Sequence, residues 1–252
     1  VTATGVLLSI LVRRSFGLES GTYDVVLGIA NSILFYSGLG LSGSLPKFLP
    51  ELQVHAGRRA AARLVVRLGS IRLAIIIMIL VPLNVWAEPI ARALALGPDG
   101  ALYLRLLSAL LVGRATLDFA YRTLDSFFQQ LSVNLLSLVH GVLDLCLVAV
   151  VLVMGWQMAG VIGALGVSAM AMTFVAGSAV FRYVRAMPTG TAASEQEPSL
   201  SRIWKLSGFT YLRDLALYFA TPAFASPVLV TLLGGPEPVA LFATSFFIAS
   251  ST

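Results

Sequence analysis

Apolar residues occur along this chain in blocks of about 20, the length that an α-helix needs to cross the hydrocarbon core of a bilayer. Six such blocks predict complete membrane spans over residues 25 to 45, 64 to 86, 102 to 124, 131 to 154, 158 to 181 and 206 to 233. Shorter apolar runs, Val6 to Val12 and Val239 to Ile248, are interpreted as truncated spans at the two ends. The pattern therefore predicts an all-α, polytopic transmembrane helical bundle.

One polar stretch interrupts the apolar pattern. Residues 187 to 199 contain two prolines and two glutamates, which is typical of a solvated linker. We expect residues 1–186 to form an N-terminal transmembrane lobe with a truncated first span and complete spans 2 to 6. Residues 187–201 would be a cytoplasmic linker, and 202–252 would begin a C-terminal lobe with span 7 and a truncated span 8.

Composition supports the membrane interpretation, because 58% of the 252 residues are hydrophobic and only 12% are charged. A soluble domain carries about 25% charged residues. The net charge of +5 is spread along the chain without an aromatic-rich basic patch, so no nucleic-acid partner is expected.

By the positive-inside rule, the connections that carry more Lys and Arg face the cytoplasm. Ten basic residues fall on the side predicted to be cytoplasmic and four on the other: Lys47, Arg58, Arg59, Arg63, Arg67, Arg122, Arg182, Arg185, Arg202 and Lys205 against Arg13, Arg14, Arg92 and Arg105.

Motifs for catalysis or cofactor binding are missing from the sequence. The segment GLGLSG, residues 38 to 43, matches the dinucleotide-binding pattern, but that fingerprint requires a preceding strand, and here it ends a predicted span. His55 and His140 belong to no zinc motif, and no phosphate-binding P-loop occurs. The single cysteine, Cys146, is interpreted as a packing residue. We therefore expect no catalytic residue, no metal site and no cofactor, and a protein that is not an enzyme.

Charged residues within the spans are the candidate functional groups, because each costs about 2.5 to 3.5 kcal/mol on insertion scales. Arg114, Asp118, Arg122 and Asp125 follow one another at intervals that place them on one helix face. Two interpretations stand side by side. The four residues form a self-neutralising ladder, or they form the polar wall of a central cavity, in which Arg114 and Asp118 would contact substrate.

Further charged residues lie at depth in three other predicted spans. Asp144 lies midway through a span with His140 one turn before it, which indicates a proton or sodium site or, equally, a partner for an arginine on another span. Arg213 and Asp214 are adjacent in span 7 and point in different directions, so at most one of them should face a given cavity. Arg72 is expected to reach the cytoplasmic surface and to be structural.

Glycine and proline inside the spans predict close packing and bending. Gly160, Gly163 and Gly166 form a small-residue face, as in helices that pack closely in lipid. Pro222 and Pro227 fall in span 7 and are either packing features or a hinge for rocking between two open states.

Several segments together resemble a known family. The stretch GLGLSGSLPKFLPEL at 38 to 52, the turn FGLESGTYDVV, the connection YRTLDSFFQQLSVNLL and the junction GWQMAGVIGALG are similar to the O-antigen-type lipid-linked oligosaccharide flippases. These are polysaccharide exporters of the multidrug/oligosaccharidyl-lipid/polysaccharide (MOP) exporter superfamily. The resemblance implies a MATE-like two-lobe fold, of which this chain would hold the first lobe and the start of the second.

The resemblance also implies a function. The protein would be a multi-pass transporter in a bacterial cytoplasmic membrane that flips or exports a polyprenyl-diphosphate-linked oligosaccharide for cell-surface polysaccharide assembly. Such a substrate needs cationic groups for its diphosphate, and Arg114 and Arg213 are the candidates.

Other functions remain open at this stage. A cation-coupled multidrug exporter of the same superfamily would use acidic groups such as Asp144. A membrane-embedded glycan polymerase or glycosyltransferase would need larger outer loops than residues 155 to 159 or 234 to 238 provide. A structural subunit of a larger complex is a further alternative.

Overall fold

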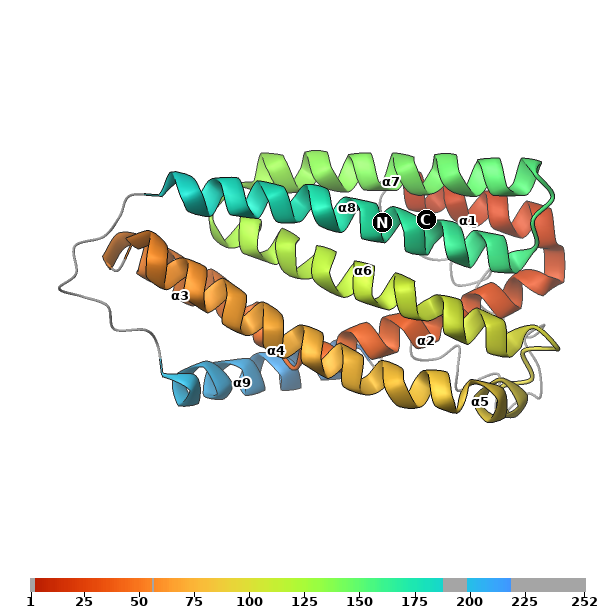
Figure 1. The fold of residues 1–252 in the computed structure, drawn as a ribbon, viewed down its shortest axis with the longest axis horizontal. Helices are drawn as coiled ribbons and strands as arrows, with labels where there is room; N and C mark the ends of the chain where they lie inside the picture. Colours follow the sequence, from red (N-terminus) through yellow and green to blue (C-terminus); the bar gives the residue numbers. More distant parts are fainter. Residues whose placement is uncertain (1–2, 56, 188–198, 219–252) are drawn as a thin grey trace.

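The computed structural model describes residues 3–55, 57–187 and 199–218. These residues form helices and contain no strand, as the apolar pattern predicted. Figure 1 shows their arrangement, in chain order α1 (Ala3–Phe16), the 3-10 turn η1 (Gly17–Glu19), α2 (Ser20–Gly38), α3 (Leu41–His55), α4 (Gly57–Val85), α5 (Ala87–Ala93), α6 (Gly100–Ser126), α7 (Gln130–Val153), α8 (Met158–Ala186) and α9 (Leu200–Tyr218).

Four of these helices, α4, α6, α7 and α8, are long and apolar enough to cross a membrane. They correspond to the spans predicted at 64 to 86, 102 to 124, 131 to 154 and 158 to 181. A fifth is obtained if α2 and most of α3 count as one span bent by 45°. The described residues thus contain the long apolar helices of a membrane protein.

The predicted span over 25 to 45 is wrong in its boundaries, because the helix stops at Gly38. Leu39 and Gly40 adopt left-handed backbone angles, with φ of 43° and 66°, which an α-helix cannot contain. A second helix, α3, then starts at Leu41 in a new direction. The GLGLSG segment is therefore the joint between two helices rather than the phosphate loop of a βαβ unit.

Helix α6 lies at the centre of the bundle, between α8 on one side and α4 on the other (Figure 1). It approaches α8 closely at Gly113, where an added Cβ would lie 2.8 Å from the Cβ of Ala169 and 2.9 Å from backbone atoms of α8. Leu107, Leu110 and Leu111 are fully buried around this contact. Glycine thus permits the tight packing that helices use in lipid.

The small-residue face predicted on α8 is only partly used in this way. Gly166 approaches α6, with the Leu110 nitrogen 3.4 Å from a built Cβ. Gly160 instead packs against Trp156, in the turn before α8, and against Val151 of α7, and Gly163 has nothing within 4 Å. The glycine in the tight contact between α6 and α8 is Gly113, which the sequence pattern did not single out.

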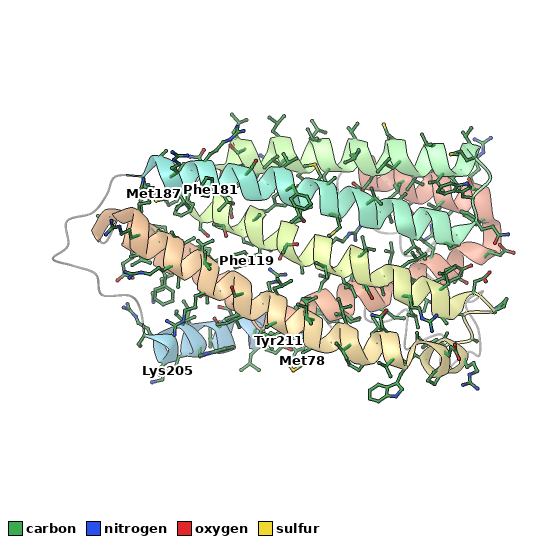
Figure 2. The ribbon with its side chains drawn as sticks, in the orientation of Figure 1. Met78, Phe119, Phe181, Met187, Lys205 and Tyr211 are labelled. Carbon is green, nitrogen blue, oxygen red and sulfur yellow. The ribbon has the colours of Figure 1, made fainter. Side chains whose placement is uncertain are left out.

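The outer surface of the bundle is apolar. Large hydrophobic side chains on α7 and α8 are exposed along the length of both helices, and Figure 2 shows Met78 of α4 and Phe181 of α8 on the outside. In water this surface would be unfavourable, whereas a bilayer solvates it. The exposed residues of α7 and α8 include Leu131, Leu135, Leu138, Val142, Val150, Val153, Val167, Phe174 and Phe181.

Helix α9 packs across α2 and α3, on the side of α6 that faces away from α7 and α8 (Figure 1). The contact depends on two glycines of the joint, since a Cβ on Gly40 would collide with the Ser207 carbonyl and one on Gly43 with Thr210. At the far end of α3, Arg202 of α9 pairs with Glu51 at 3.8 Å and lies over the ring of Phe48. These contacts bring the first helix of the predicted second lobe against the first lobe.

Candidate functional site: two arginine-lined cavities

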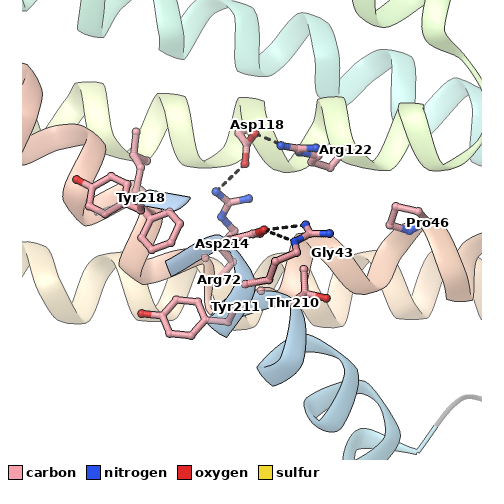
Figure 3. Close-up of a pocket in the computed structure, with 14 residues that line it drawn as sticks. Gly43, Pro46, Arg72, Asp118, Arg122, Thr210, Tyr211, Asp214 and Tyr218 are labelled. Carbon is pink, nitrogen blue, oxygen red and sulfur yellow. Dashed lines mark hydrogen bonds and ion pairs between the residues drawn. The ribbon is translucent and has the colours of Figure 1, made fainter. Parts of the chain in front are cut away.

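Two cavities lie against α6, on the side where α2 and α9 pack. The larger, of about 620 Å³, is lined by residues of α2, α3, α4, α6 and α9 (Figure 3), and the smaller, of about 350 Å³, by residues of α2, α4, α6 and α7. Both volumes fall in the range of about 300 to 1,000 Å³ that is typical of ligand sites. They share Leu34, Phe35, Arg72 and Asp118, so they adjoin each other.

Asp118 of α6 forms the boundary between the two cavities by binding two arginines. Its carboxylate lies 2.8 Å from Arg72 of α4 and 3.7 Å from Arg122 on the next turn of α6 (Figure 3). The Arg72 side chain is only 5% exposed, so the expectation that it reaches the cytoplasmic surface was wrong. The Asp118 carboxylate compensates the buried Arg72 guanidinium for the hydration that it loses.

Arg114 is not part of a charge ladder. The spacing along α6 predicted neighbouring pairs, but only Asp118 and Arg122 are close enough to interact. Among the residues that the structure describes, Arg114 has no ion-pair or hydrogen-bond partner, although it is half-buried and lines the smaller cavity. Asp125, the last predicted member of the ladder, is exposed. Arg114 therefore carries a positive charge into the smaller cavity, and none of the described carboxylates lies within ion-pair distance of it.

Arg213 and Asp214 of α9 both line the larger cavity, in contrast to the expectation that only one of them would face it. They bind each other, since Nε and Nη2 of Arg213 donate to Oδ1 of Asp214 at 2.9 and 2.7 Å. Their side chains are 66% and 39% exposed, so the pair stays accessible to a ligand. The described lining of the two cavities thus contains four arginines and two aspartates.

His140 and Asp144 lie together on α7, with Nε2 of the histidine 3.5 Å from Oδ1 of the aspartate. Both atoms are buried, and neither makes a hydrogen bond within the described part of the chain. No arginine pairs with Asp144 among the described residues, in contrast to the alternative of an interhelical ion pair. Among the described residues, the charged and titratable neighbours of the pair on other helices include Arg114 and Tyr121 of α6 and Tyr23 of α2.

The structure adds residues that the sequence interpretation missed. Phe35 of α2 lines both cavities, and Tyr211 and Tyr218 of α9 line the larger one. The two tyrosines are seven residues apart and so share a face of α9, a spacing visible in the sequence. Near α7, Arg13 and Asp24 form a pair at 3.0 Å between α1 and α2.

The two hinge candidates, Pro222 and Pro227, lie outside the described residues, as does most of the predicted linker. Within the ranges that the structure describes, no three His, Cys, Asp or Glu side chains are grouped so that they could hold a metal ion.

The chain was compared with protein-family models, with curated proteins and with solved structures, and nothing matched it in any of the three comparisons.

Proposed function

We propose that the protein is a secondary transporter that flips a polyprenyl-diphosphate-linked oligosaccharide across the cytoplasmic membrane of a bacterium. The described helices would form the first lobe of a MATE-like two-lobe fold, and α9 would begin the second. The observation that supports this most is Arg114, a charge within a membrane-spanning helix that lines a cavity and has no partner among the described residues.

The charge of the cavities favours an anionic ligand. A guanidinium inside a membrane protein is stable only beside counter-charges, water or a ligand. The two aspartates that line the cavities are already bound to arginines, namely Asp118 to Arg72 and Arg122, and Asp214 to Arg213. Because arginine holds phosphate through two parallel hydrogen bonds, Arg114 is suited to a diphosphate.

The same balance of charge disfavours a multidrug exporter for cationic compounds, which would need free carboxylates in the cavity. The His140–Asp144 pair fits coupling instead of drug binding, because its carboxylate is buried at depth beside a titratable imidazole. We propose that this pair exchanges a proton during transport.

A membrane-embedded polymerase or glycosyltransferase is also disfavoured. Between α7 and α8, residues 154 to 157 form a turn that is too short to carry catalytic groups. Four arginines and two aspartates of the described chain instead line the cavities within the helical bundle. That distribution suits the passage of a polar headgroup rather than chemistry at the membrane surface.

Reconstitution tests the proposal. Full-length protein in liposomes should move a fluorescent polyprenyl-diphosphate-linked sugar between leaflets, measured as the fraction protected from a membrane-impermeant quencher. A matched fluorescent phosphatidylcholine should not move faster than in protein-free liposomes. Equal movement of both lipids would indicate a non-selective scramblase, and no movement of the glycolipid under any ion gradient would contradict the proposal.

A further inference from the structure

Aromatic side chains line one wall of the larger cavity, and the proposed binding of a diphosphate does not require them. Phe35 of α2 lies between two tyrosines of α9, with its ring centroid 4.3 Å from that of Tyr218 and 5.8 Å from that of Tyr211. The rings are nearly parallel, at 8° and 23°. All three line the cavity, where Figure 3 labels both tyrosines.

The two tyrosines differ in their hydrogen bonding. Tyr218 is buried, and its hydroxyl lies 2.5 Å from that of Ser32, which fixes α9 against α2. Tyr211 is only partly buried, and its hydroxyl has no hydrogen-bond partner among the described residues. Phe35 covers one face of the Tyr211 ring, and no other aromatic ring in the described part of the chain covers the second. Tyr211 lines the larger cavity, so its partly exposed ring and its hydroxyl can be reached from there.

Polar groups flank Tyr211 on the same helix. Both hydrogen bonds that Asp214 accepts from Arg213 reach Oδ1, and Oδ2 has no partner within the described residues. The Thr210 hydroxyl donates to the Leu206 carbonyl and keeps its lone pairs for a donor in the cavity. One wall thus combines an aromatic face with a charged acceptor, a neutral acceptor and a phenol.

We infer that this wall, formed by Tyr211, Thr210 and Asp214, is the subsite for a pyranose ring of the transported glycan. The C–H groups on one side of a pyranose carry partial positive charge and pack on the negative face of an aromatic ring. Its hydroxyls donate to carboxylates through charge-assisted hydrogen bonds. The inference rests on the proposed function. The sugar would occupy the larger cavity and the diphosphate would bind Arg114 in the smaller one, with Asp118 between them.

Binding of paired lipids tests the inference. The full-length protein in lipid nanodiscs is titrated with a polyprenyl diphosphate that carries no sugar, and with the same lipid carrying a single hexose, N-acetylhexosamine or 6-deoxyhexose. The quantity compared is the ratio of the Kd of the bare lipid to that of the glycosylated lipid. We expect a ratio of about ten or more for at least one sugar, since one aromatic contact with one charged hydrogen bond suffices for that.

Two variants should lower this ratio toward one while the Kd of the bare lipid stays the same: Tyr211→Phe, which retains the ring stack and loses the phenol, and Asp214→Asn. The matched control is Tyr218→Phe, which loses the bond to Ser32 and should lower the melting temperature without changing the ratio. Similar loss of the ratio in Tyr218→Phe and Tyr211→Phe would overturn the inference, because the tyrosine hydroxyls would then act only by holding the helices together.

The two proposals fail in different ways. Equal Kd values for the bare lipid and all three glycolipids in the wild-type protein would overturn the sugar subsite and leave the diphosphate site standing. No binding of any of the four lipids would overturn both.

Discussion

Asp118 is the residue on which the packing of the charged groups depends most, because it neutralises Arg72 across the α4–α6 contact. Asp118→Asn should lower the free energy of unfolding by about 1 to 3 kcal/mol. This loss is smaller than for a fully buried ion pair, because solvent screens the half-exposed carboxylate. Asp125→Asn, an exposed change on the same helix, should have an effect below about 0.5 kcal/mol. Melting temperatures of the purified proteins measure the difference. Equal values for the two variants would show that the Arg72–Asp118 pair does not stabilise the bundle.

Asp144 is the residue whose removal should separate coupling from binding. If the His140–Asp144 pair carries the proton, Asp144→Asn should bind the lipid-linked substrate normally and lose the acceleration of transport by a pH gradient. The assay compares initial transport rates in liposomes with and without that gradient, for the wild type, Asp144→Asn and the exposed control Asp125→Asn. Acceleration of the Asp144→Asn variant to the wild-type extent would remove the pair from the coupling mechanism.

Residue spacing predicted neighbours along one helix but not partners across helices. The intervals between Arg114, Asp118 and Arg122 placed them on one face, and one of the two expected contacts forms. The other carboxylate–arginine contact is with Arg72, which lies 46 positions away in sequence and on another helix. Because no spacing rule connects α4 with α6, the isolation of Arg114 became visible only in three dimensions.

At the scale of helices, the α6–α8 contact should tolerate added volume poorly. Gly113→Ala would place a methyl group against the backbone of α8, and overpacking of this kind costs about 1 to 3 kcal/mol. Gly163→Ala is the matched control, since its Cβ would meet nothing within 4 Å and alanine favours the helix by about 1 kcal/mol. Thermal unfolding of both variants checks the prediction. A Gly113→Ala protein as stable as Gly163→Ala would mean that the two helices are farther apart than described.

Apolar periodicity located the long helices well and the joints poorly. The spans in α4, α6, α7 and α8 were predicted within a few residues at most ends, because uninterrupted apolar blocks have no other structure available in lipid. The break at Leu39 and Gly40 was missed, since the apolar block continues through it. The glycines at 38, 40 and 43 were the available signal, because closely spaced glycines favour a break in a helix.

At the scale of the whole molecule, the fourteen basic residues counted for the topology separate toward the two ends of the bundle. The start of α4 and the end of α8 meet at one end, where Arg58 donates to the Arg185 carbonyl at 3.1 Å, and α5 lies at the other (Figure 1). The first end carries most of the ten basic residues predicted to be cytoplasmic. The arrangement agrees with that count, and the orientation in the membrane stays a prediction.

Cysteine labelling tests this orientation. Asp99→Cys, in the connection before α6, and Arg59→Cys, at the start of α4, are both at exposed positions and are compared in a Cys146→Ser background. A membrane-impermeant maleimide should label Asp99→Cys in intact cells, and Arg59→Cys only after permeabilisation. Labelling of both positions from the same side would contradict the predicted topology, as would labelling of Arg59→Cys from outside.

Dependence of glycolipid transport on Arg114 is the most direct test of the central claim that an isolated arginine binds the diphosphate inside the membrane. The initial rate in liposomes is measured for Arg114→Lys, Arg114→Ala and the control Arg105→Ala, an exposed arginine on the same helix that faces Glu88 at 3.7 Å. Because Asp118 keeps Arg72 and Arg122 as partners, removal of Arg114 should not destabilise the bundle. We predict a partial loss of rate for lysine, a loss of about tenfold or more for alanine, and wild-type transport for the control. Wild-type transport by well-folded Arg114→Ala protein would contradict the account.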